Sequence, residues 1–149
     1  MTGRLDWSYF LTLLRWAIDG LVWVWPVTAA LVVGVVALAC RAARQRPRPP
    51  LLPMAWQTAL LSVPLLTLAL GARYRCENCS PSALGQGLRH DAAMHVADAL
   101  FVAQVAWAIW FVYASARRRV LAAFVQALLL WCTLWAGLMA GMSMSGDWL

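Results

Sequence analysis

Four stretches of the chain run for about twenty residues with few or no charged side chains, which is the length of helix that crosses a membrane. Inside lipid, every backbone polar group must be paired within the protein, and uninterrupted apolar runs of this length indicate helices. We therefore predict an all-α integral membrane protein. Its predicted spans cover residues 20–40, 54–72, 92–116 and 120–142.

The composition excludes the main alternatives to a membrane protein. Hydrophobic residues make up 63% of the chain and charged residues only 12%, which leaves too little polar side chain to cover a soluble domain. Intrinsic disorder requires the opposite balance, with low hydrophobicity and high charge. With 149 residues, the chain has room for one membrane domain, and we expect a four-transmembrane-helix bundle.

The net charge of +6 indicates an orientation in the membrane. All the basic residues are arginines, and seven of them fall in the loop 41–52 and the turn 117–119, which carry no acidic residue. Short basic loops mark the cytoplasmic side, so the loop 73–91, the tail 143–149 and both termini are predicted to be external. We expect a bacterial inner membrane protein. Nucleic acid is not an expected partner, because the arginines do not spread over a water-facing patch.

The segment 5–19, ahead of the first span, has helical periodicity and one polar stripe. The stripe consists of Arg4, Ser8, Thr12, Arg15 and Asp19. We predict an amphipathic interfacial helix on the outer membrane surface, with Gly20 as the bend into the first span. The alternative is one long helix whose stripe packs against a partner subunit. Pro26 and Pro64 lie inside predicted spans and are expected to kink them.

Small residues at intervals of four predict close contacts between helices. Gly137 and Gly141 form a GxxxG pair in the last span, and Ala30 and Gly34 form a similar pair in the first. Such pairs let helix backbones approach each other in lipid. The expected contact is within the bundle, in a dimer or in a larger complex.

One helix face of the third span carries Asp91, His95 and Asp98, at spacings of four and three. Asp98 is expected about two turns inside the span, where an unpaired charge is costly. A proton relay and a metal site are two interpretations. The third is a buried ion pair of Asp98 with Arg15, Arg73 or His95 that sets the helix register.

The external loop contains a CxxC motif, Cys76 and Cys79. On that side of a bacterial membrane the pair is expected to form a disulfide or redox pair, or to bind a metal through its thiolates. Covalent haem attachment would need a histidine in the position of Ser80. Cys40 and Cys132 lie too far from the loop to bridge to it.

Thiol, thioether and imidazole side chains gather near the external ends of the predicted spans. These candidate metal ligands are Cys76, Cys79, His90, Met94, His95, Met142 and Met144. Such a ligand set prefers copper(I), or zinc if the thioethers do not take part. Methionines near helix ends also serve as packing residues, and both interpretations stay open here.

Several of the ten tryptophans lie deeper than the membrane interface, where these residues usually concentrate. The deep ones are Trp23, Trp25, Trp107, Trp110, Trp131 and Trp135. They indicate helix or lipid packing, or contact with a flat cofactor such as a quinone.

No phosphate-binding loop, nucleophile elbow or zinc-protease motif occurs in the sequence, so we expect a protein without catalytic activity. The leading prediction is an accessory or structural subunit of a larger membrane complex. Its expected partners are the lipid bilayer and other membrane subunits or further copies of the chain. One alternative is a thiol-redox or copper-handling protein of the external face. The other is a proton-coupled transport component that uses Asp98.

Overall fold

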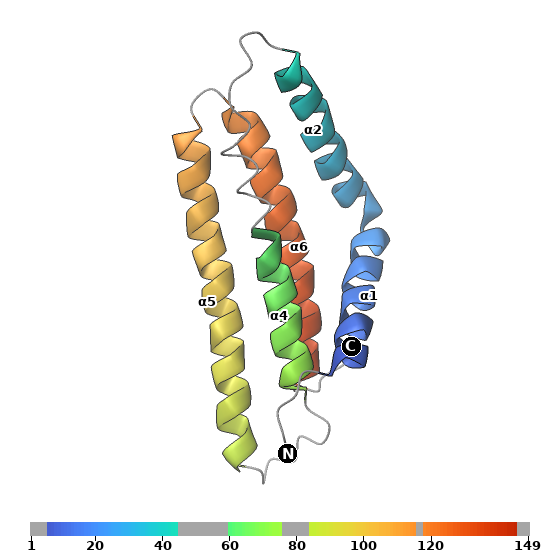
Figure 1. The fold of residues 1–149 in the computed structure, drawn as a ribbon, viewed down its shortest axis with the longest axis vertical. Coiled ribbons are helices and arrows are strands. Elements are labelled where there is room, and N and C mark those ends of the chain that lie inside the picture. Colours follow the sequence, from blue (N-terminus) through green and yellow to red (C-terminus); the bar gives the residue numbers. More distant parts are fainter. Residues whose placement is uncertain (1–5, 45–59, 76–83, 116–117, 146–149) are drawn as a thin grey trace.

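The computed structural model describes residues 6–44, 60–75, 84–115 and 118–145, with only the backbone described for residues 84–90. Within these ranges the chain forms helices and no strand, which confirms the all-α prediction. The helices are α1 (Trp7–Trp23), α2 (Trp25–Ala43), α4 (Ser62–Arg73), α5 (Leu84–Ala114) and α6 (Arg119–Ser145) (Figure 1).

Three of the described helices are long and apolar enough to cross a membrane: α2, the segment Asp91–Ala114 of α5, and α6. α4 has 12 residues. It is therefore about 18 Å long, shorter than a hydrocarbon core of about 30 Å. Residues 54–59, the first part of the span predicted at 54–72, lie outside the described ranges. The structure therefore confirms an all-helical chain with three candidate membrane-spanning helices among the described residues. The four-helix membrane bundle stays a prediction.

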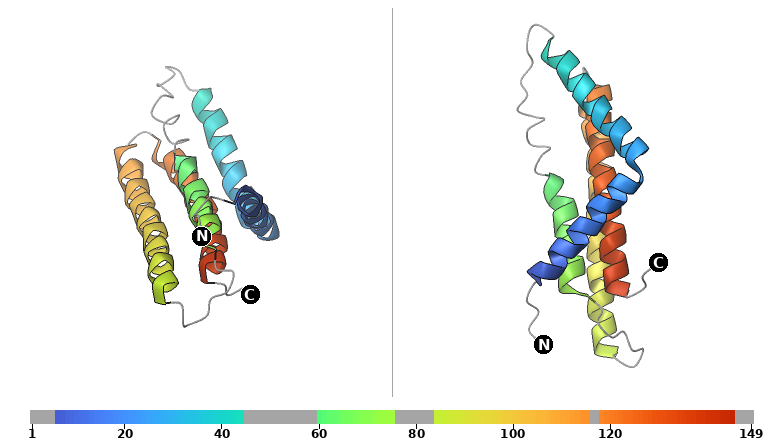
Figure 2. Two further views of the ribbon diagram at one scale, coloured as in Figure 1. Left: turned by 60° about the horizontal axis from the view of Figure 1, so that its bottom comes forward. Right: turned by 90° about the vertical axis from the view of Figure 1, so that its right-hand side faces the viewer.

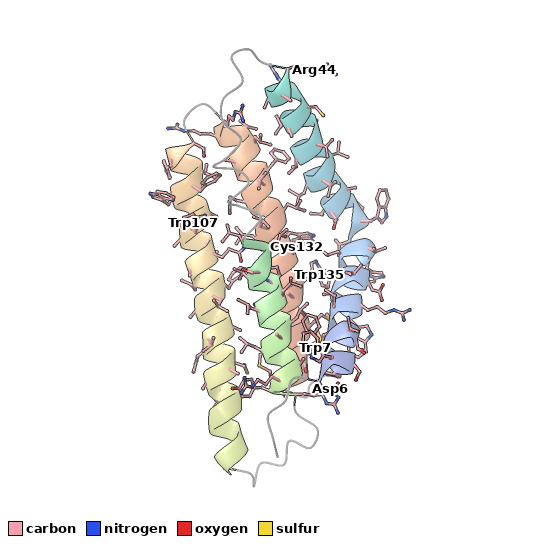
Figure 3. The ribbon with its side chains drawn as sticks, in the orientation of Figure 1. Asp6, Trp7, Arg44, Trp107, Cys132 and Trp135 are labelled. Carbon is pink, nitrogen blue, oxygen red and sulfur yellow. The ribbon has the colours of Figure 1, made fainter. Side chains whose placement is uncertain are left out.

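α6 is the central helix, because α1, α2, α4 and α5 all contact it. α4 and α6 lie between α1 and α5 (Figures 1 and 2). The end of α2 and the start of α6 lie at one end of the bundle, and Figure 3 shows Arg44 there and Asp6 at the other end. Arg44 and Arg119, from the two arginine-rich segments, are therefore at the same end, as the predicted topology requires. The side of the membrane that this end faces stays a prediction.

The helical path into the first span breaks at Val24, between α1 and α2. Pro26 lies in the first turn of α2, where its missing N–H leaves no hydrogen bond unmade. Across the break, the Thr28 hydroxyl donates to the carbonyl oxygen of Leu21 at 2.8 Å and accepts from the indole N–H of Trp131 at 3.1 Å. One threonine therefore joins both helices to α6.

The predicted bend at Gly20 is wrong, because Gly20 lies inside α1. A Cβ atom at this position would lie 2.5 Å from Cε3 of Trp135, whose ring lies between α6 and α1 (Figure 3). Gly20 therefore permits the close approach of two helices, and the break follows from Pro26. Pro64 also lies in a first turn, that of α4; residues 54–59 of its predicted span lie outside the described ranges, so the kink expected there stays a prediction.

One face of α1 is part of the bundle core. The core cluster contains Leu13, Ala17, Leu68, Ala72 and Ala136, from α1, α4 and α6. On the polar stripe, Ser8, Arg15 and Asp19 are exposed. The helix is therefore amphipathic as predicted, but its apolar face packs on other helices of the chain. Its predicted position on the membrane surface stays a prediction.

α4 approaches α6 closely at Gly71. A Cβ atom on Gly71 would lie 2.7 Å from the Cα and 2.8 Å from the Cβ of Ala140. Next to this contact, the Ser143 hydroxyl donates to the carbonyl oxygen of Gly71 at 3.0 Å and shares a 3.1 Å hydrogen bond with the hydroxyl of Tyr9. These contacts join α1, α4 and α6 at the end of the bundle opposite Arg44.

Candidate functional site

A groove of about 380 Å³ opens between α5 and α6, and α4 contributes one residue to it. Its lining residues are Thr67, Met94, Ala97, Asp98, Phe101, Thr133, Leu134, Gly137, Leu138, Gly141, Met142 and Met144. On α5 the lining residues follow the i, i+3, i+4, i+7 pattern of one helix face. The groove is therefore an apolar surface feature that contains one carboxylate.

That carboxylate is Asp98, the residue predicted to lie inside the third span. It lies seven residues after Asp91, the first residue of the apolar segment of α5. This distance corresponds to about 10 Å along the helix. Within the described residues, Asp98 makes no hydrogen bond or ion pair.

The predicted ion-pair partners of Asp98 are engaged elsewhere. Arg15 is 4.0 Å from Asp19, and the guanidinium of Arg73 lies over the ring of Tyr74. His95 is exposed and is not one of the residues that line the groove. The interpretation of Asp98 as a buried ion pair therefore finds no support in the described part of the chain. The relay through Asp91 and His95 and the transport role stay predictions.

Two hydroxyl groups on the groove do not serve Asp98 either. Thr67 donates to the carbonyl oxygen of Val63, and Thr133 donates to that of Leu129, both at 2.9 Å. Each hydroxyl hydrogen is therefore used within its own helix. The groove thus offers a strong acceptor without a donor from the described side chains around it. Both threonines lie within apolar stretches of the sequence, and neither was among the predicted site residues.

The two glycines of the GxxxG pair form part of the groove wall. A Cβ atom placed on Gly137 or Gly141 meets no other part of the described structure within 4 Å. No described helix of the chain packs on them, so their predicted packing partner stays a prediction. Gly34 does pack on α6, against the ring of Phe124, whereas Ala30 is exposed.

The groove also gathers three of the seven predicted metal ligands: Met94, Met142 and Met144. Met144 is almost fully buried, in a cluster with Ala93 and Ala140. Cys76, Cys79 and the side chain of His90 lie outside the described residues. Among the side chains that are described, no three of the His, Cys, Asp and Glu type come close enough to hold a metal ion. Cys40 and Cys132 are free thiols.

The deep tryptophans divide into two groups. Trp131 and Trp135 pack against α1 and α2, through Thr28 and Gly20. Trp23, Trp25, Trp107 and Trp110 are exposed, the last two with ring centroids 5.0 Å apart. No tryptophan lines the groove, and the quinone stays a prediction.

Gln104 was not among the predicted site residues. It is buried in α5, and both atoms of its amide group lack a hydrogen-bond partner in the described structure. An amide in an apolar span is visible in the sequence, but its burial depends on how α5 packs.

No protein-family model, curated protein or solved structure matches this chain.

Proposed function

We propose that the chain is a non-catalytic subunit of a larger membrane complex, and that a transmembrane helix of another subunit packs in the groove between α5 and α6. The observation that carries this proposal is Asp98, a carboxylate on an apolar groove without a donor from the described part of this chain. Acidic side chains within spanning helices are costly, by up to about 3 kcal/mol at the helix centre, so they usually pair with another group. A donor on a neighbouring helix removes that cost.

The glycines on the opposite wall support a helix as the occupant. Gly137 and Gly141 leave open space in front of the α6 backbone. A neighbouring helix can therefore approach α6 closely and gain van der Waals contact, which drives helix association in lipid. The groove thus combines a surface for close packing with one polar group that specifies the partner. The predicted bacterial inner membrane, with the arginine-rich end in the cytoplasm, is the setting of this proposal.

The test is the native size of the complex. The tagged chain is extracted in a mild detergent from the membrane in which it is naturally made, and its size is measured on a native gel. We expect a large complex for the wild type and a smaller species for Asp98→Asn and Gly137→Leu. Asp91→Asn and Ala103→Leu are matched controls on the exposed surface of α5 and should keep the wild-type size.

Two results contradict the proposal. One is a wild-type chain that migrates as a solitary monomer from its native membrane. The other is a complex whose size is the same in both groove variants and in both controls.

The three methionines on the groove favour copper handling as a second candidate function. Thioether sulfurs are ligands that copper(I) prefers, and Met94, Met142 and Met144 line one surface. In a copper(I) titration against a chromophoric chelator, Met94→Leu should weaken binding. Met139→Leu is the control, because Met139 packs against the core cluster around Leu13. Equal affinity of the wild type and Met94→Leu would remove this candidate.

A further inference from the structure

The outer face of α1 is a row of exposed residues with a cation in its middle. The row consists of Leu11, Arg15, Ile18 and Val22, at spacings of four, three and four, which place them on one helix face. The side chain of Arg15 is 82% exposed, and the three apolar residues are 59%, 51% and 64% exposed. This face points away from Leu13 and Ala17, which pack in the core. The outer face therefore has no partner among the described helices.

Arg15 lies at the same depth in the bundle as Asp98. α1 and α6 are antiparallel, and the hydrogen bond between Tyr9 and Ser143 sets their register. Arg15 is six residues after Tyr9, and Gly137 is six residues before Ser143, so the two lie at about the same level. The cluster of Ala93, Ala140 and Met144 sets the register of α5 on the antiparallel α6, and Asp98, five residues after Ala93, therefore lies near the level of Gly137.

The row also matches the groove in length. Leu11 and Val22 are eleven residues apart, as are the groove residues Thr133 and Met144 on α6. Each distance corresponds to about 16 Å of helix. The row therefore extends over the same length as the glycine-containing wall of the groove.

The other described arginines do not lie at this depth. Arg41 and Arg44 end α2, and Arg118 and Arg119 begin α6, at the far end of the bundle; Arg73 ends α4, and Arg75 lies over the ring of Tyr9 near the other end. Arg15 is in contact with Asp19 at 4.0 Å, but both side chains are exposed. The Arg15–Asp19 separation is at the outer limit of an ion pair, and the guanidinium of Arg15 stays accessible to a further partner.

Resting on the proposed function, we infer that the helix in the groove is α1 of a second copy of this chain, with Arg15 of one copy paired with Asp98 of the next. Copies inserted in the same direction share one depth in the membrane, so Arg15 and Asp98 of neighbouring copies lie at the same level, where the inclined α1 (Figure 2) crosses the groove. The contact joins two different surfaces and is therefore heterologous. Repeated around an axis along the membrane normal, such a contact gives a ring if the rotation between copies closes and an open row if it does not.

Charge exchange between two differently tagged copies tests the inference. Wild-type copies should co-purify when they are expressed together and extracted in a mild detergent. Two copies of Arg15→Asp should lose this association by more than about tenfold, and so should two copies of Asp98→Arg, because like charges then face each other. One copy of Arg15→Asp expressed with one copy of Asp98→Arg should associate again, since opposite charges meet at both types of contact. Arg41→Asp and Asp91→Arg are the controls and should behave as the wild type.

Cysteine cross-linking gives a second test that does not depend on inserting new charges. Ile18 is nine residues after Tyr9, and Leu134 is nine residues before Ser143, so these exposed residues lie at one level. Ile18→Cys in one tagged copy and Leu134→Cys in the other should form an intermolecular disulfide. The diagnostic band requires both substitutions, because the native cysteines are common to all samples. Ile18→Cys with Val102→Cys, which is exposed on α5, should give no such band.

The outcomes separate this inference from the proposed function. A complex with another membrane protein that depends on Asp98, without association or cross-linking between copies, overturns the inference and leaves the proposed function in place. Association between copies that is unchanged by all the charge variants also overturns the pairing of Arg15 with Asp98. A monomer in the native membrane overturns both.

Discussion

The contact of α4 with α6 at Gly71 makes a sharp stability prediction. In Gly71→Ala, the new Cβ would lie 2.7 Å from the Cα of Ala140, whereas carbon atoms prefer separations of about 3.5–4.0 Å. α4 must then withdraw from α6 by roughly 1 Å, and overpacking of this kind costs about 1–3 kcal/mol. The withdrawal also stretches the 3.0 Å hydrogen bond from Ser143 to the carbonyl oxygen of Gly71. Such bonds contribute about 0.6 kcal/mol in membrane proteins.

Alanine has a higher helix propensity than glycine, by about 1 kcal/mol, and this gain partly offsets the loss. We therefore expect Gly71→Ala to lower the free energy of unfolding by about 1–2 kcal/mol, which changes the unfolding equilibrium about tenfold. The measurement is reversible unfolding in mixed micelles of a mild detergent and dodecyl sulfate. It is monitored by the fluorescence of the ten tryptophans.

Gly137→Ala is the matched control, since a Cβ atom at Gly137 meets no other part of the described structure within 4 Å. Only the propensity gain remains there, so this variant should be as stable as the wild type or more stable by up to about 1 kcal/mol. If Gly71→Ala is as stable as Gly137→Ala, α4 and α6 do not make the close contact, and the reasoning is refuted.

Three further predictions concern α1 and its junction with α2. Leu13→Ala should destabilise the bundle by about 2–4 kcal/mol in the same unfolding assay, because Leu13 is fully buried, whereas the exposed Leu11→Ala should change little; equal effects would show that α1 is not docked. Thr28→Val should lower the free energy of unfolding by about 1 kcal/mol, because the hydrogen bond to the Leu21 carbonyl is lost. It should also increase amide hydrogen exchange around the break between α1 and α2, and unchanged exchange would contradict this role of Thr28. Hydrogen bonds from the Ser8 hydroxyl and from the backbone N–H groups of Tyr9 and Ser8 hold the pKa of the Asp6 carboxyl below its usual value. Ionised Asp6 therefore stabilises the fold above the ordinary aspartate pKa, and this contribution disappears as the pH falls through the lowered value. Asp6→Asn should flatten the acid limb of a plot of stability against pH, and an unchanged plot would contradict the capping role.

The sequence predicts the long helices well, because length and lack of charge decide them. The spans predicted at 92–116 and 120–142 correspond to α5 and α6. The boundary between α1 and α2 was misplaced because the sequence offers two candidate positions for it, Gly20 and Pro26. Gly20 has the stronger local signal for a bend, but its place in the structure is set by Trp135 on a distant helix. Pro26 acts locally, and it decides where the new helix begins.

The candidate site was predicted only in part, for a similar reason. Asp98 is recognisable from its charge inside an apolar run. The residues that line the groove together with Asp98 depend on how α5 packs on α6. Met94 lines the groove, whereas His95 does not. The contact predicted for the GxxxG pair stays a prediction, since Gly137 and Gly141 have no packing partner among the described helices. Gly71 makes such a contact without a second glycine, because what matters is the side chain that faces it.

The two charges at one depth explain how specificity could arise on such an apolar surface. Apolar helix faces pack in many registers at similar free energy, since lipid and leucine are equally apolar neighbours. In the proposed contact, Arg15 and Asp98 select one register, because a shifted register leaves the Asp98 carboxylate without a donor. α4 and α6 lie between the helices that carry them, so the chain cannot pair the two charges internally (Figure 1). In the proposed contact, a second copy at the matching depth offsets the cost that the unpaired Asp98 imposes on a single copy.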